Sequence, residues 1–417
     1  MKTNIIKEAH RCLQCKKPLC RKGCPNGTRI NEMIALFLEG ELEQAGQMLF
    51  ENNPLSVICS KICPHENFCE GRCVLGKKST PVQISTIEHF ISNYYLDHLE
   101  AESCRVLNKE KIAIIGSGPA GITVAFILAA NCYEVTIFES EDKIGGILQY
   151  GIPEFRLSKE LLAKLKDALI KMGVKIRPNT LIGPVISIDD LLADAYSAVF
   201  IGTGVWNPRP LRIAGETLGH VHYGINYLKN PEAFRLGRSL AVIGAGNVAM
   251  DVARTAIHHG VEEVTILYRR GQENISATRH EFDSAVEDGV KFAFHHAPVR
   301  IVEEGVLCTW TRPDTADGDQ ELLVRADSVI IAISQNPRSN LSGIGKEQNG
   351  LVITDEDGRT TREGVFASGD VVTGAKTVAE AVSCSKRSAA AIMEYVNEKR
   401  GPLKMINPSM SRGQEPG

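Results

Sequence analysis

The sequence predicts an α/β protein in which a helical, cysteine-rich N-terminal domain precedes two nucleotide-binding domains of the Rossmann type. Three observations support this prediction. Eight of the twelve cysteines lie within the first 73 residues. A glycine-rich turn between an apolar strand and a helix occurs twice, after residues 115 and 243. A third strand, turn and helix around Gly369 is assigned to the first of these domains, which implies that the second domain is inserted into the first.

The composition limits the classes of function. The chain has 417 residues, 47 of them basic and 50 acidic, with no long run of either sign. This balance gives no excess of positive charge of the kind that binds nucleic acid or anionic lipid. The N-terminus has no apolar leader, and apolar stretches such as ITVAFILAA are shorter than the roughly 20 residues that span a bilayer. We therefore expect a cytoplasmic protein with no membrane span and no nucleic-acid partner.

The N-terminal cysteines form two groups joined by a helical hairpin. The groups are C-x2-C-x4-C-x3-C-P, from Cys12 to Pro25, and C-x3-C-P-x4-C-x3-C, from Cys59 to Cys73. The intervening residues 30–53 have apolar side chains at helical spacing. Cysteine runs with a C-P dipeptide are typical of iron-sulfur ligands, and disulfides are rare in the cytoplasm. Two zinc sites or a disulfide scaffold are the alternatives, but zinc prefers paired C-x2-C units and only one exists here.

The first glycine-rich motif predicts a flavin site. KIAIIGSGPAG is an apolar strand followed by Gly116-x-Gly118-x-x-Gly121, a helix, and a second strand that ends in Glu139. The glycines permit close approach to a pyrophosphate, and a carboxylate at this position accepts ribose hydroxyls. Gly145-Gly146 and Gly369-Asp370 are expected to approach the same ligand.

The second motif predicts a nicotinamide site. Gly244-x-Gly246-x-x-Ala249 follows a strand, and the next strand ends in Arg269 and Arg270 instead of an acid. Guanidinium groups bind a 2'-phosphate, which favours NADP(H) over NAD(H). The alternative is that both arginines are simply a solvated strand end.

Two such sites predict hydride transfer between a nicotinamide and a flavin, with no catalytic side chain. A disulfide reductase of this plan needs a cysteine pair beside the flavin. The remaining cysteines, Cys104, Cys132, Cys308 and Cys384, are scattered singly, and we expect them to be small buried side chains. We therefore expect that electrons do not leave the flavin through a redox-active cysteine pair.

Taken together, these motifs resemble one family. It contains the small subunit of bacterial glutamate synthase, the N-terminal half of dihydropyrimidine dehydrogenase, and the stand-alone flavin subunit of the bacterial NAD-dependent enzyme. The resemblance runs from the first cysteine group to about residue 398 and includes GSGPAG, GGILQYGIPEFRL, GAGNVAMDVARTA and FASGD in that order. The arginine pair is closer to the NADPH users, whereas the compact length is closer to the pyrimidine enzyme.

The resemblance implies two 4Fe-4S clusters, FAD and NADP(H). The first cluster would be held by Cys12, Cys15, Cys20 and Cys73, and the second by Cys24, Cys63, Cys69 and Glu88. Cys59 would be a structural spare. FAD would contact Ser117, Gly118, Pro119, Ala120, Gly121, Glu139, Gly145, Gly146, Arg156, Gly369, Asp370 and Thr377. The nicotinamide nucleotide would contact Ala245, Gly246, Asn247, Val248, Arg269 and Arg270, near Ser334, which replaces a glycine of many relatives.

The implied activity is that of a FAD-dependent NAD(P)H oxidoreductase that passes electrons through both clusters to a partner subunit. That partner would carry the substrate site and an FMN. An electron-bifurcating transhydrogenase subunit and a redox-responsive interaction protein are the alternatives. The expected domains are a cluster domain (1–105), an FAD-binding domain in two segments (106–230 and 336–398) with an NAD(P) domain between them (231–335), and a disordered tail (399–417).

Overall fold

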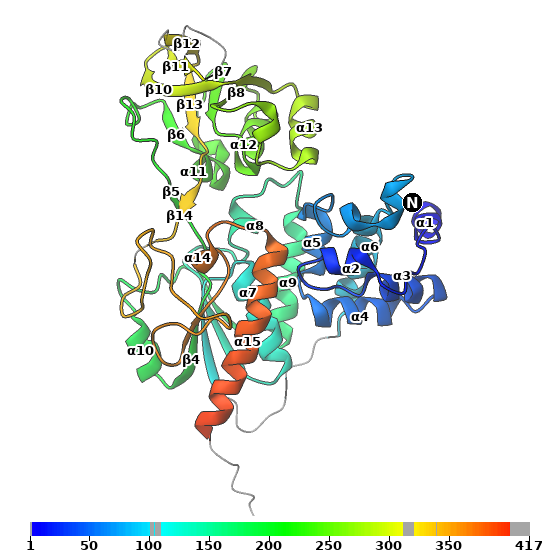
Figure 1. The fold of residues 1–417 in the computed structure, drawn as a ribbon. Helices are drawn as coiled ribbons and strands as arrows, with labels where there is room; N and C mark the ends of the chain where they lie inside the picture. Colours follow the sequence, from blue (N-terminus) through cyan, green and yellow to red (C-terminus); the bar gives the residue numbers. More distant parts are fainter. Residues whose placement is uncertain (1, 101–103, 105–109, 312–320, 339, 401–417) are drawn as a thin grey trace, which may run out of the picture.

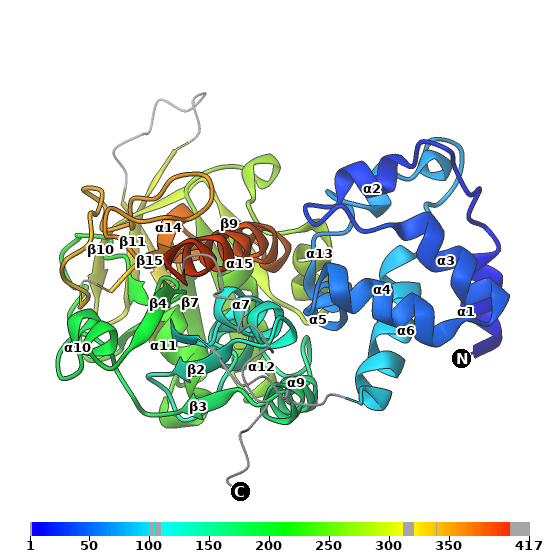
Figure 2. The ribbon, with the colours of Figure 1, turned by 90° about the horizontal axis from the view of Figure 1, so that it is seen from below.

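The computed structural model describes residues 2–100, 104, 110–311, 321–338 and 340–400 of the 417-residue chain. These residues form a helical lobe and two α/β lobes, with the helical lobe beside the first α/β lobe (Figure 1, Figure 2). No helix in these ranges is both long and apolar enough to cross a bilayer.

Six α-helices and two short 3-10 helices build the N-terminal lobe. They are α1 (Lys2–Ala9), α2 (Leu19–Gly23), α3 (Ile30–Glu39), α4 (Leu42–Asn52), α5 (Ser56–Ile62), η1 (Glu70–Arg72), η2 (Val74–Lys77) and α6 (Ile84–His98). α3 ends at Gly40, whose φ of 89° permits the sharp turn into α4. Buried Met33, Ile34 and Leu49 face α6 and its neighbours. The helical hairpin predicted over 30–53 is therefore confirmed, with α4 ending at Asn52.

The first α/β lobe contains a parallel five-stranded sheet in the order β15-β4-β1-β2-β3. Its strands are β1 (Lys111–Ile115), β2 (Glu134–Phe138), β3 (Lys175–Arg177), β4 (Tyr196–Ile201) and β15 (Val365–Ala367). Its helices are α7 (Pro119–Ala130), α8 (Ile147–Tyr150), α9 (Lys159–Lys171), α10 (Ile188–Ala193), α14 (Asp370–Thr373) and α15 (Val378–Arg400). β15 follows the whole second lobe in sequence, so the second lobe is inserted into the first.

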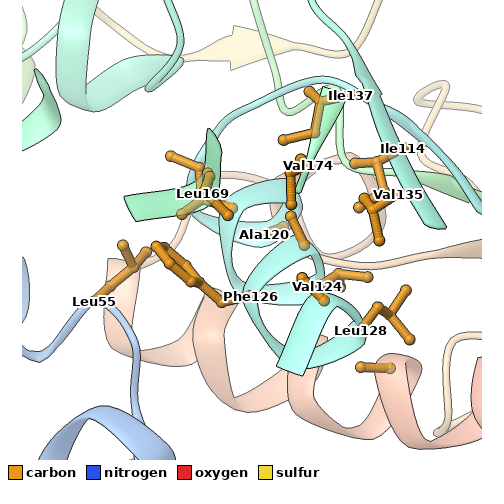
Figure 3. Packing of buried hydrophobic residues seen from close by; sticks show 14 of the residues in the cluster. Leu55, Ile114, Ala120, Val124, Phe126, Leu128, Val135, Ile137, Leu169 and Val174 are labelled. Atoms are coloured by element: carbon orange, nitrogen blue, oxygen red, sulfur yellow. The ribbon is translucent and has the colours of Figure 1, made fainter. Parts of the chain in front are cut away.

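The helical lobe shares a hydrophobic core with this sheet. Phe126 of the almost fully buried α7 packs edge-to-face on Phe50 of α4, with ring centroids 5.2 Å apart. Leu55 lies beside Phe126 within the same cluster (Figure 3). Continuous apolar packing of this kind fixes the two lobes relative to one another, which a polar and hydrated contact would not.

The second α/β lobe contains a parallel sheet in the order β6-β13-β7-β8-β9 and a three-stranded antiparallel sheet, β10-β11-β12. The strands are β6 (Val221–Tyr223), β7 (Ser239–Ile243), β8 (Glu263–Tyr268), β9 (Lys291–Phe294), β10 (His296–Val302), β11 (Gly305–Trp310), β12 (Glu321–Arg325) and β13 (Ser328–Ile331). The helices are α11 (Gly224–Lys229), η3 (Pro231–Ala233), α12 (Asn247–His258), η4 (Gln272–Asn274) and α13 (Arg279–Glu287).

Two features differ from the expected boundaries. β6 pairs with β13, so the second sheet begins before residue 231; a three-residue edge strand carries too little pattern to be recognised. α15 continues to Arg400, beyond the expected start of the tail at 399, and residues 401–417 lie outside the described residues. The chain crosses between the α/β lobes along β5 (Asn207–Pro208) and β14 (Gln335–Asn336), which pair antiparallel.

The expectation that Cys104 and Cys132 stand alone is wrong. They form a disulfide between the segment before β1 and the residue after the α7 C-cap, with their Cα atoms 5.3 Å apart. Their separation of 28 residues and the absence of a motif left no signal in the sequence.

Candidate functional site

A cavity of about 1030 Å³ lies where the two glycine-rich turns face each other. Most of the expected cofactor-binding residues line it: Ser117, Gly118, Pro119, Ala120, Glu139, Gly146, Arg156, Ala245, Gly246, Asn247, Val248, Arg269, Ser334, Gly369, Asp370 and Thr377. Gly121, Gly145 and Arg270 are not among its lining residues. The carboxyl ends of β1 and β7 thus open into one space, which is where open α/β sheets bind ligands.

The first glycine turn is shaped for close approach of another group. Gly116 has a φ of 95°, and a Cβ on Gly121 would lie 2.0 Å from the Gly116 carbonyl oxygen. A Cβ on Gly146 would lie 2.8 Å from Gly118 Cα, so side chains are excluded at both places. The N-terminus of α7 follows directly, and its free N–H groups suit a pyrophosphate.

The Glu139 carboxylate at the end of β2 is held in a fixed orientation. It accepts hydrogen bonds from the Ser117 N–H at 2.9 Å and the Ser117 hydroxyl, and from the Glu141 N–H at 2.9 Å. The side chain is buried and lines the cavity. Its place beside the glycine turn fits the predicted contact with ribose hydroxyls.

Asp370 and the start of α15 also line the cavity. Burial raises the pKa of Asp370 to about 6. Thr377 and Glu380 form a reciprocal cap at the start of α15: the Thr377 N–H donates to the Glu380 carboxylate at 3.0 Å, and the Glu380 N–H donates to the Thr377 hydroxyl at 3.3 Å. The cap fixes this helix terminus against the cavity.

The second glycine turn shows the same restriction. Gly244 has a φ of 129°, and a Cβ there would lie 2.3 Å from the Ala332 carbonyl oxygen. Arg269 and Arg270 at the end of β8 are both exposed, with Arg269 on the cavity wall. They are therefore free to meet an anionic group outside the strand end, as the sequence predicts for a 2'-phosphate.

Arg156 lies at the contact between the two α/β lobes. Its Nη1 donates to both carboxylate oxygens of Asp251 on α12, at 2.7 and 2.6 Å, and its Nη2 lies 2.7 Å from Glu281 Oε1 on α13. Arg254 joins the same network through Glu281 at 3.4 Å. Burial raises the pKa of Asp251 to about 7, although Arg156 opposes that rise. Neither carboxylate was recognised from the sequence, because both are distant from Arg156 along the chain.

Ser334 follows β13 on the cavity wall, directly before the crossing strand β14. Its φ of 143° lies in the region that favours glycine. Ser334, which replaces a glycine of many relatives, therefore places a side chain at a position whose backbone conformation suits glycine.

The four thiols assigned to the first cluster lie together. Cys12, Cys15, Cys20 and Cys73 line one small cavity of about 30 Å³ with apolar neighbours. Burial raises the pKa of Cys20 to about 11, and the charges of Cys12 and Cys73 add to that rise. Thiolates gathered in an apolar site repel one another, and a bound cationic centre removes that cost. The donor set suits a thiolate-bound iron-sulfur centre.

The second set is also brought together. The pKa of Cys69 is raised by burial and then by the charge of Glu88, with Cys24 also acting on it. The pKa of Cys63 is raised by a hydrogen bond with Cys59, by burial, and by the charges of Glu88 and Cys69.

Glu88 itself is buried on α6, and burial raises its pKa to about 7. Cys59 is buried beside Cys63 and accepts a hydrogen bond from Asn53 Nδ2 at 3.3 Å. In the described part of the chain, no three His, Cys, Asp or Glu side chains are placed to hold a single metal ion.

The second thiol set adjoins the large cavity. Ile62 and Pro64, the residues on either side of Cys63, are part of the cavity wall. Asn26, two residues after Cys24, donates a hydrogen bond from Nδ2 to the Ala379 carbonyl oxygen of α15 at 3.2 Å. No cysteine is among the lining residues that the structure describes, and the Cys104–Cys132 disulfide is not part of the wall.

Comparison with known proteins identifies two matched regions. A family described as dihydropyrimidine dehydrogenase domain II, 4Fe-4S cluster, matches residues 1–99. A family described as pyridine nucleotide-disulphide oxidoreductase matches residues 110–385. The matches coincide with the helical lobe and with the two α/β lobes together.

Curated relatives match over nearly the whole chain. The glutamate synthase (NADPH) small chain of Halomonas elongata is 32% identical and covers 94% of this chain and 90% of the relative. The corresponding small chain of Escherichia coli is 30% identical, covering 93% and 91%. The NAD-dependent dihydropyrimidine dehydrogenase subunit PreT of Salmonella typhimurium is 31% identical and covers 94% of each chain.

Solved structures match the two α/β lobes. FprA from Mycobacterium tuberculosis in complex with NADPH has a TM-score of 0.61 at 15% identity and covers 70% of this chain and 86% of its own. Lactococcus lactis thioredoxin reductase has a TM-score of 0.56 at 24% identity, covering 70% of this chain and all of its own. These likenesses support the fold.

Proposed function

Because the chain belongs to the family of glutamate synthase small chains and dihydropyrimidine dehydrogenase PreT subunits, an oxidoreductase family, we propose that it feeds electrons from NADPH to a partner subunit. In this proposal FAD binds at the first glycine turn, NADP(H) binds at the second, and two 4Fe-4S clusters occupy the thiol sets. The NAD(P) domain is the lobe inserted into the FAD domain.

One observation carries the proposal. A single cavity is lined by both glycine turns and also by Ile62 and Pro64, which flank Cys63 of the second thiol set. This cavity would let a nicotinamide, a flavin and the second thiol set be neighbours without any movement of the lobes. The shared core around Phe50 and Phe126 supports a fixed spacing between them.

The proposed order of electron flow follows from the same contact. The second set, with Cys24, Cys63, Cys69 and Glu88, adjoins the cavity, whereas the first set lines a separate one. A hydride carries two electrons and iron-sulfur centres accept one each, so the flavin supplies the conversion between the two. Electrons would then leave through the second set and afterwards the first.

The chain's own residues hold and orient the nucleotides. Glu139, fixed by Ser117 and Glu141, would accept the ribose hydroxyls of FAD. Arg269 and Arg270 would bind the 2'-phosphate and so favour NADPH over NADH. Arg156, with Asp251 and Glu281, would hold the two nucleotide lobes at a fixed distance.

The partner would be a subunit that carries the substrate site and an FMN, because the relatives are named as a small chain and as a subunit of larger enzymes. The setting would be the cytoplasm, where NADPH is available.

The test compares Cys63→Ser with Cys308→Ser, a buried thiol on β11 distant from both sets. Anaerobically purified protein is mixed with NADPH, and flavin bleaching and one-electron dye reduction are followed separately. We expect rapid flavin bleaching in both variants and a loss of at least tenfold in dye reduction in Cys63→Ser alone. Absence of flavin bleaching in the wild type, or equal dye reduction by both variants, would overturn the proposal.

A further inference from the structure

The surface around the first thiol set has an unusual charge. Residues 9–31 and 71–87 contain nine basic residues and no acidic one, whereas the whole chain has 47 basic and 50 acidic residues. Eight of the nine are exposed. Within the helical lobe, the positive charge is therefore concentrated on the two segments that supply Cys12, Cys15, Cys20 and Cys73.

Several of these cations are free to meet an external anion. In the described part of the chain, no carboxylate lies within ion-pair distance of Lys16, Lys17 or Lys22, whereas Arg29 is paired with Glu32 at 2.9 Å. Lys17 and Lys22 line an open hollow of about 490 Å³, together with Cys24 of the second set. Lys17 and Lys22 thus lie beside Cys24 of the second set, and Lys16 directly follows Cys15 of the first set in sequence.

Apolar side chains accompany this charge. Leu13 and Leu19 are 61% and 40% exposed, and both also line the small cavity that holds the four thiols of the first set. α2, which begins at Leu19, lies at the edge of the helical lobe (Figure 2). Exposed apolar residues within a charged rim are typical of a protein contact.

We propose that this surface, defined by Leu13, Lys16, Lys17, Leu19 and Lys22, is the electron exit and docks a partner protein through an acidic face that carries a one-electron acceptor. The inference rests on the proposed function and adds the chemistry of the partner. Opposite charge steers the encounter and fixes its orientation, and the two leucines supply the dry centre. In the complex, a reduced iron-sulfur cluster held by the first set would be oxidised by one electron, and the acceptor would be reduced by that electron.

A competing role for the lysines is to offset the negative charge of the thiolates, which would change the reduction potential instead of the docking. The experiment therefore uses two small one-electron acceptors of opposite charge, ferricyanide and hexaammineruthenium(III). Photoreduced full-length protein is mixed with each in a stopped-flow instrument, so that the exit is tested independently of NADPH. The variant is K16E/K17E, and the control is K166E/K171E, which makes the same charge change at exposed positions of α9.

At low salt we expect K16E/K17E to slow ferricyanide reduction about fivefold and to accelerate hexaammineruthenium(III) reduction, with both effects lost at about 0.5 M salt. The control should change either rate by less than about 1.5-fold. Equal effects of the two variants would overturn the exit surface. A change of the same sign with both acceptors would indicate a potential effect and would overturn it too. Failure of NADPH to bleach the flavin would instead contradict the proposed function alone.

Discussion

Arg156 of the first α/β lobe donates from one nitrogen to both carboxylate oxygens of Asp251 in the second, at 2.7 and 2.6 Å. The two side chains are only 11% and 4% exposed, so the pair is screened little by water. Glu281 completes the bridge at 2.7 Å. Hydride transfer requires the two cofactor rings to be held at a fixed distance and orientation. This buried bridge lies between the two lobes that would hold them.

Removal of the guanidinium should be costly. In Arg156→Ala, buried Asp251 loses the guanidinium and Glu281 keeps only Arg254, so we expect the free energy of unfolding to fall by about 3 kcal/mol. The matched control is Arg238→Ala, which breaks an exposed pair with Glu262 and should leave the free energy of unfolding nearly unchanged. Chemical denaturation followed by circular dichroism measures both, and equal losses would contradict the bridge.

Asp251 predicts a pH dependence of stability. Its pKa is about 7 in the folded chain against an ordinary value of 3.8, so the folded state holds a proton that the unfolded state releases. The free energy of unfolding should therefore fall as pH rises through the interval from about 4 to about 7. In the Asp251→Asn variant, the free energy of unfolding should lose this part of its dependence on pH. An identical pH profile in the variant and the wild type would show that Asp251 is ionised throughout.

Nucleotide preference should depend on the end of β8. Replacement of both Arg269 and Arg270 by alanine removes the cations expected at the 2'-phosphate, so we expect KM for NADPH to rise at least tenfold with little change for NADH. Arg279→Ala is the control, because Arg279 is exposed in the same lobe and paired with Asp283. Parallel changes for the two nucleotides would exclude 2'-phosphate recognition.

The Cys104–Cys132 disulfide should contribute to stability without contributing to turnover. A loop of 28 residues closed by a disulfide stabilises the folded state by about 3 kcal/mol in the chain-entropy account. We expect reductant to lower the Tm of the wild type but not that of the Cys104→Ala/Cys132→Ala variant, with unchanged NADPH oxidation in both. Loss of turnover in the variant would assign the pair a redox role.

The local elements were predictable because their signals are local. Residues 30–53 have apolar side chains at helical spacing. The turns at Gly116 and Gly244 leave no room for a side chain, so their glycines are visible as a motif in the sequence. The family resemblance supplied the two thiol sets, whose members then proved to be neighbours.

The contacts between lobes were not predictable. Arg156 was expected at the flavin, and only the fold brings Asp251 and Glu281 to it. The Cys104–Cys132 pairing and the edge strand β6 depend in the same way on long-range packing. Ion pairs and cross-links of this kind join residues far apart in sequence. Neither the hydrophobic periodicity nor the spacing of cysteines predicts such contacts.

The most direct test is the metal and sulfide content of protein purified without air. Two 4Fe-4S clusters and one flavin predict about eight irons and eight acid-labile sulfides for each FAD. Zinc in place of iron, or a preparation without labile sulfide, would contradict the electron route through the thiol sets.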